Sequence, residues 1–166
     1  MASVTFKITR NDISPALSRM AATARNPRKV LLSMGNVFQS ITMGNFRANP
    51  SYRPQPWAPK RDGSPSFLMK NNVLSRSFHL DVTDRYAKLG TPMIYAAIHQ
   101  FGGIIKGRPW LMFQYGPGKK DWATVAQVKI PARPFFPVEN GRLTEKAAKI
   151  IGAAGERAML REAKGE

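Results

Sequence analysis

The sequence predicts an α+β fold in which a small, mostly antiparallel sheet is packed by a long helix in the N-terminal half and by a C-terminal helix. Apolar residues recur at helical spacing in two long segments, near 27–48 and near 142–163. Short segments of alternating polarity, bounded by turn residues, lie between them. The length of 166 residues, 43% of them hydrophobic, fits a single domain spanning 1–166.

The first predicted elements are a strand and a short helix. Val4, Phe6 and Ile8 alternate with polar residues, which indicates a half-buried strand. A short helix is expected near 13–25, with Leu17 and Met20 on its apolar side.

The long helix has clear start and stop signals. Asn26-Pro27 favours a start, because asparagine caps a helix and proline fits its first turn. Asn49-Pro50 favours a stop near residue 48. The expected buried stripe consists of Leu31, Met34, Phe38 and Ile41, widened by Val30 and Val37.

Residues 49–66 form an irregular, proline-rich loop with five prolines. Its candidates for partner contacts are Tyr52, Arg53, Trp57, Lys60 and Arg61. Interleaved basic and aromatic residues suit single-stranded nucleic acid, and they also suit a groove on a protein partner. A solvated loop with Trp57 folded back on the core explains the same residues.

Several short elements follow the loop. We expect a helix near 67–76, and strands at 78–83 and 86–89 that pair across Asp84-Arg85. A further helix at 92–101 should dock through one apolar face and end at Gly102-Gly103. That face consists of Ile94, Ala97, Ile98 and Phe101.

A hairpin is predicted from residues 110–115 and 122–130. One expected face holds Leu111, Phe113 and Tyr115, and the other holds Trp122, Ala126, Val128 and Ile130. The turn-rich link contains Lys119 and Lys120, which are candidates for reaching a partner. The link is not a phosphate loop, because Phe113 stands where that motif needs glycine.

Asn140-Gly141 precedes the final helix, which is expected near 142–163. Its buried stripe should consist of Leu143, Ala147, Ile150, Ile151, Ala154 and Ala158. Its basic residues lie largely off that stripe.

The chain is strongly basic, with 26 basic and 10 acidic residues and a net charge of +16. Self-repulsion at this charge opposes compaction, so an anionic partner is expected: nucleic acid, an acidic protein surface or anionic lipid. The excess is spread over both halves of the chain. The absence of cysteine excludes disulfides and thiolate chemistry.

We predict no catalytic, cofactor or metal site, and therefore no enzyme. No carboxylate lies within ten residues of His99 in the sequence. His79 and Asp81 form a single pair, whereas a metal site normally needs three or four ligands. We also expect no signal peptide and no membrane span, since the long uncharged run 30–46 contains many polar residues.

Two segments resemble a known family. These are Tyr95-Ala96-Ala97-Ile98-His99-Gln100-Phe101-Gly102-Gly103 and, further along, Ile130-Pro131-Ala132-Arg133-Pro134-Phe135. In this order they resemble the virion-morphogenesis, or tail-completion, family of tailed bacteriophages, which includes the Mu-like head–tail joining proteins. Supporting segments are Trp57-Ala58-Pro59, Leu74-Ser75-Arg76-Ser77-Phe78 and Gly90-Thr91. Asn72 stands where that family usually has glycine, a mild departure because asparagine tolerates left-handed geometry.

The resemblance implies a virion component at the head-proximal end of the tail or in the neck, made in the bacterial host cytoplasm. It would form a ring, with six-fold symmetry as the expectation, and make the tail competent to join the head. The implied partners are other copies of the chain, tail tube or terminator proteins and head-connector proteins, with non-specific contact with packaged DNA and no membrane. The alternatives are a basic nucleic-acid-binding module and an assembly chaperone that leaves the particle.

Most residues of the two segments are expected to be structural: Tyr95, His99, Gln100, Phe101, Gly102, Gly103, Pro131, Pro134 and Phe135. The two prolines that flank Arg133 should keep that stretch extended and off the hydrogen-bond ladder. Arg133 then either bonds a carbonyl or an acid of its own subunit or contacts a neighbouring subunit.

Overall fold

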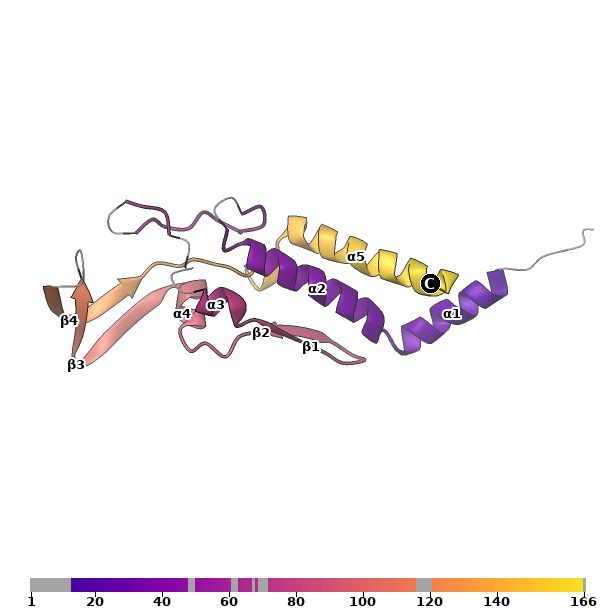
Figure 1. The fold of residues 1–166 in the computed structure, drawn as a ribbon, viewed down its shortest axis with the longest axis horizontal. Coiled ribbons are helices and arrows are strands. Elements are labelled where there is room, and N and C mark those ends of the chain that lie inside the picture. The colour runs from indigo at the N-terminus through magenta and orange to yellow at the C-terminus, as the bar shows by residue number, and fades with distance from the viewer. Residues whose placement is uncertain are drawn as a thin grey trace, which may run out of the picture. The chain divides into compact units, whose positions relative to one another are not determined.

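The computed structural model describes residues 13–47, 50–60, 63–66, 68, 72–115 and 121–165 (Figure 1). Within these residues the chain forms five helices and three two-stranded antiparallel sheets. The predicted α+β class is therefore confirmed. The strands form three separate pairs, because each strand bonds only its neighbour in sequence.

The chain divides into two compact units. The helical unit comprises the described residues of Met1–Ser40, His79–Gly90 and Glu145–Glu166. The hairpin unit comprises those of Ile41–Phe78 and Thr91–Thr144. The single domain spanning 1–166 stays a prediction.

The helical unit contains α1 (Ile13–Arg25), α5 (Glu145–Lys164) and most of α2 (Arg28–Gly44). The predicted bounds of α1 are confirmed, and α2 begins directly after Asn26-Pro27 as expected. The Asn26 side-chain oxygen accepts the N–H of Arg28 at 3.4 Å. The apolar side expected for α1 is wrong, because α1 buries none of its residues and Leu17 is exposed.

Helix α5 packs on α2 through small residues. Ala147, Ile151, Ala154 and Ala158 are buried, as predicted. Gly155 is also buried, and a Cβ there would lie 2.9 Å from the Met34 sulfur. Small side chains thus let the two helices approach closely.

The predicted pairing across Asp84-Arg85 is confirmed. Strand β1 (His79–Val82) pairs with β2 (Ala87–Gly90), with His79 opposite Gly90 and Val82 opposite Ala87. Leu80 lies against Gly35 of α2, where an added Cβ would come within 2.8 Å of the leucine Cδ1. The glycine therefore makes room for this strand on the helix.

The hairpin unit contains α3 (Val73–Arg76), α4 (Ala96–Phe101), and the strands β3 (Gly103–Tyr115), β4 (Asp121–Ile130), β5 (Val138–Glu139) and β6 (Arg142–Leu143). The helix predicted near 67–76 is wrong in length, since α3 is a single turn. Asn72 precedes it at a φ of 54°, and this left-handed geometry agrees with the expectation for that asparagine. Residues 67 and 69–71, like the strand predicted from Val4 to Ile8, lie outside the described residues.

Strand β3 begins at Gly103, well before the predicted residue 110. The register shifts between Lys106 and Leu111, so Gly107-Arg108-Pro109-Trp110 form a bulge. Bulges break the alternation from which strands are predicted.

The final helix begins at Glu145, later than the predicted residue 142. Asn140 and Gly141 instead form the turn between β5 and β6, with φ values of 50° and 75°. An Asn-Gly pair with both φ values positive is typical of a tight hairpin turn. Leu143 therefore lies in β6, where it is exposed, and not on the buried stripe of the helix.

Candidate assembly surface

An aromatic core holds the hairpin unit together. The Phe46 and Phe135 rings stack with centroids 5.5 Å apart, and each residue is 1% exposed. Phe78 lies 5.4 Å from Phe135, and the Trp57 ring meets Phe46 edge-on at 5.7 Å. The Trp57 indole N–H also donates to the Pro134 carbonyl at 2.8 Å. Trp57 is therefore folded back on the core, so its ring is not available to a partner in this conformation.

The two family-like segments are joined through their main chains. The side-chain oxygen of Gln100 accepts the N–H groups of Phe135 and Phe136, both at 3.0 Å. The N–H of Arg133 donates to the His99 carbonyl at 2.6 Å. Residues 131–135 belong to no strand, which confirms that this stretch lies off the ladder. Helix α4 thus supplies acceptors that a neighbouring strand would otherwise provide.

Gly102 lies where these segments come closest. Its φ is 70°, and an added Cβ would lie 2.8 Å from the backbone nitrogen of Ala132 and 3.0 Å from the Ile130 carbonyl oxygen. Only glycine tolerates both this conformation and this approach without strain. The glycine therefore fixes how α4 leads into β3.

The predicted buried face of α4 is wrong. Ala96 and Gln100 point inward, whereas Ile94 is 97% exposed and Phe101 is 78% exposed. The physical reason lies in the hydrogen bonds, because Gln100 satisfies two amides that would otherwise be left unpaired in the interior. This geometry turns Ile94 and Phe101 outward.

The β3–β4 hairpin buries none of its described side chains. Met112, Trp122 and Trp110 are 68%, 61% and 60% exposed. In the described part of the chain, each strand pairs on one side only. A lone two-stranded hairpin is marginal in water, and long apolar edge strands invite pairing with another chain. These features are typical of a surface that becomes covered in an assembly.

The sequence carried a signal for this surface that the prediction missed. Trp110, Leu111, Met112 and Phe113 are four consecutive apolar residues. A strand with one solvated face alternates, so an unbroken apolar run indicates that both faces need cover. The prediction assigned Leu111 and Phe113 to one face and left the intervening residues unexplained.

His99 has a structural environment. Burial lowers the pKa of His99, and the nearby Arg133 charge lowers it further. The Tyr95 ring lies 5.9 Å from the imidazole, edge-on. Both effects favour the neutral form of the imidazole.

Two predicted contact arginines bond their own chain. Arg53 donates from Nε to the Asn45 carbonyl at 2.6 Å, and its guanidinium lies 3.6 Å from the Trp57 ring centroid. Arg133 donates from Nε to the Ala58 carbonyl at 3.2 Å. Both arginines thus tie residues 53–58 of the predicted loop to the core.

Of the remaining contact candidates, only Tyr52 and Lys60 belong to the described residues. Tyr52 is half-buried and Lys60 is exposed. Arg61, Lys119 and Lys120 lie outside the described residues. The described residues bring together no three metal-ligating side chains, and none of the described helices is long and apolar enough to cross a membrane. A role for any of these candidates in partner contacts stays a prediction.

Comparison with known proteins identifies the family. Residues 8–154 match the Phage virion morphogenesis family. Over 127 residues the chain is 30% identical to the Mu-like prophage FluMu G protein 2 of Haemophilus influenzae. The aligned region covers 75% of this chain and 76% of that protein. No solved structure matches. The chain therefore belongs to the phage virion morphogenesis family, and its role lies in the assembly of phage virions.

Proposed function

We propose that this protein completes the head-proximal end of the phage tail, or the neck, and enables head–tail joining as a ring-shaped oligomer, with six subunits as the expected number. The observation that carries the proposal is the β3–β4 hairpin, which exposes two tryptophans and a methionine and buries no described side chain. The protein acts through binding and geometry, and it catalyses no reaction.

A closed ring requires two different patches on each subunit that complement each other. The hairpin supplies one patch, through Met112 and Trp122. The exposed surface of α4 and of the turn before it supplies the other, through Phe101 and Ile94. Aromatic and methionine side chains of this kind are enriched at protein interfaces. In the ring, the hairpin of one subunit covers α4 of the next.

The external partners are tail tube or terminator proteins on one side of the ring and head-connector proteins on the other. The net charge of +16 favours acidic surfaces on these partners. A ring of such subunits also has a lumen through which DNA passes without its sequence being read.

Native mass spectrometry of charge-introducing variants tests the two patches. Met112→Lys combined with Trp122→Lys alters the hairpin, and Phe101→Lys alters α4. We expect each variant to lose the ring, because lysine in a closely packed contact leaves an unpaired buried charge. Tyr86→Lys is the control, since Tyr86 is half-exposed in the helical unit. This control should keep the wild-type stoichiometry, both alone and with purified tail tubes.

Mixing the two variants tests whether the interface is head-to-tail. The intact hairpin of one variant can bind the intact α4 of the other, so the mixture should yield heterodimers and no ring. Rings formed by either variant alone, or a wild-type protein that stays monomeric and ignores tails, would refute the proposal.

In vitro joining of purified heads and tails gives the functional readout. The hairpin and α4 variants should fail to restore joining, and the Tyr86→Lys control should restore it. Finding the protein in purified virions distinguishes a virion component from a chaperone that leaves the particle.

A further inference from the structure

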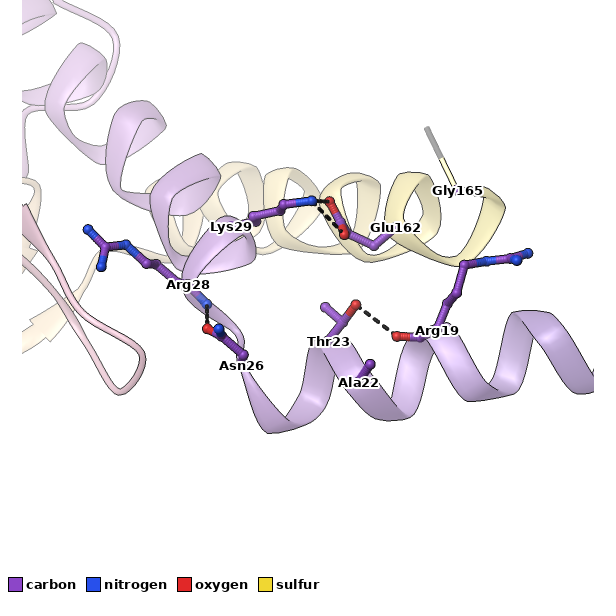
Figure 2. A pocket seen from close by; sticks show the side chains of 8 residues that line it. All are labelled: Arg19, Ala22, Thr23, Asn26, Arg28, Lys29, Glu162 and Gly165. Atoms are coloured by element: carbon purple, nitrogen blue, oxygen red, sulfur yellow. Dashed lines mark hydrogen bonds and ion pairs between the residues drawn. The ribbon is translucent and has the colours of Figure 1, made fainter.

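The helical unit contains a cavity of about 710 Å³ where three helices meet (Figure 2). The second half of α1, the start of α2 and the end of α5 contribute its walls. The lining residues are Arg19, Ala22, Thr23, Asn26, Arg28, Lys29, Glu162 and Gly165. This cavity is separate from the hairpin and α4 surfaces of the proposed function.

Positive charge dominates the cavity. Three of its lining residues are basic, and Glu162 is the single acid among them. Lys29 donates to Glu162 at 2.8 Å, so these two charges neutralise each other. The excess comes from Arg19 and Arg28, which lie on opposite sides of that pair in Figure 2. Nearby sequence adds to it, since residues 19–29 contain four basic residues and no acid.

The arginines differ in how they are held. The Arg19 Nε donates to the Ala163 carbonyl at 2.7 Å, which fixes the guanidinium at the end of α5. Arg28 bonds Asn26 through its backbone N–H, and within the described residues no side-chain bond or ion pair of Arg28 is found. Both guanidinium groups therefore keep donors for an anion.

The uncharged lining residues indicate which anion fits. Ala22, Thr23, Asn26 and Gly165 are small or polar, and no lining residue is aromatic. Stacking on nucleic-acid bases requires aromatic side chains, and a protein partner normally inserts an apolar anchor into a pocket. Phosphate groups need neither, because they bind through charge and the guanidinium fork.

We propose that this cavity binds the sugar–phosphate backbone of double-stranded DNA without reading its sequence. Arg19 and Arg28 contact phosphates, and Glu162 limits the affinity by holding Lys29. A moderate affinity of this kind lets DNA slide past the protein.

Removing the acid gives the sharpest test. Glu162→Gln frees Lys29, so binding of a short fluorescent DNA duplex, measured by anisotropy, should tighten. The slope of log affinity against log salt should steepen by about 0.9, which corresponds to one more neutralised phosphate. Glu156→Gln is the matched control, because Glu156 is exposed on the same helix, changes the net charge equally and does not line the cavity.

Removing a cation should do the reverse. Arg28→Gln should make the salt slope shallower by about 0.9 relative to Arg157→Gln, which removes an equal charge from an exposed site outside the cavity. If Glu162→Gln and Glu156→Gln changed DNA affinity equally, or if Arg28→Gln and Arg157→Gln did, DNA binding would depend on total charge alone. Either result would overturn the proposal. Tighter binding of a polyglutamate peptide than of DNA, abolished by Arg28→Gln, would overturn it in favour of an acidic protein partner.

Discussion

Individual side chains in this protein replace parts of a hydrogen-bond ladder. Asn45 donates from Nδ2 to the Phe135 carbonyl at 2.9 Å, and Gln100 accepts two amides from the same stretch. The prolines at 131 and 134 have no N–H to offer, so a neighbouring strand could pair with this stretch only poorly. The polar residues of the two family-like segments thus have a structural explanation in main-chain bonding.

The Gln100 acceptor can be tested by an isosteric change. Gln100→Met removes the oxygen but keeps the volume, which leaves the Phe135 and Phe136 amides unpaired. We expect the free energy of unfolding in urea to fall by about 2–4 kcal/mol. Gln127→Met on the exposed side of β4 should change it by less than about 0.5 kcal/mol. Similar losses in the two variants would contradict the role given to Gln100.

The lowered pKa of His99 predicts a pH dependence of stability. Burial and the Arg133 charge lower this pKa in the folded chain, so the unfolded chain binds the proton more readily. The contribution of His99 is therefore constant at higher pH, and stability falls as the pH drops below about 6.5. Urea unfolding at about pH 7.5 and about pH 5.5 measures this difference. His99→Gln should lose less stability on acidification than wild type, and an equal loss would show that His99 does not contribute.

At the scale of elements, local sequence signals correctly predicted those helices and strands whose boundaries depend on local interactions. The Asn26-Pro27 start of α2, the bounds of α1 and the β1–β2 pairing follow from caps, periodicity and turn residues. The early start of β3 and the orientation of α4 could not be predicted in the same way. The first depends on a bulge that disrupts the alternation, and the second on an amide partner far away in the sequence.

The candidate surface, too, could be predicted only in part. The family-like segments were found from their residues, but the sequence left open whether Arg53, Trp57 and Arg133 contact a partner or their own chain. The structure shows that each of them bonds its own unit. Basic residues in a loop suggest an exposed segment because they are charged. Aromatic residues do not decide the matter, because they occur both in cores and on surfaces. Only the fold shows that Trp57 fills a core and that Trp122 does not.

Close packing of α5 on α2 depends on Gly155. A Cβ at this position would lie 2.9 Å from the Met34 sulfur and 3.2 Å from its Cγ. Gly155→Val should therefore lower the free energy of unfolding by about 1–3 kcal/mol, because the helices must separate or Met34 must leave its rotamer. Gly152→Val on the same helix is the control, since nothing lies within 4 Å of its added Cβ. Equal behaviour of the two variants in urea unfolding would show that the helices do not approach as closely as described.

For the whole molecule, the net positive charge is the property that a binding partner must compensate. A net charge of +16 on 166 residues means that folding brings like charges together in both units. Sodium chloride should relieve this repulsion, because the screening length falls from about 10 Å at 0.1 M to about 3 Å at 1 M. We expect Tm to rise with salt by about 2–4 °C for each kcal/mol of repulsion relieved.

A less basic variant separates repulsion from other salt effects. Lys149→Glu combined with Arg157→Glu replaces two exposed cations of α5 and lowers the net charge by four. Its Tm should depend less on sodium chloride than the wild-type Tm does, because less repulsion remains to be screened. A wild-type Tm that falls with salt would mean that favourable ion pairs outweigh repulsion. In that case self-repulsion would not limit the stability of the fold.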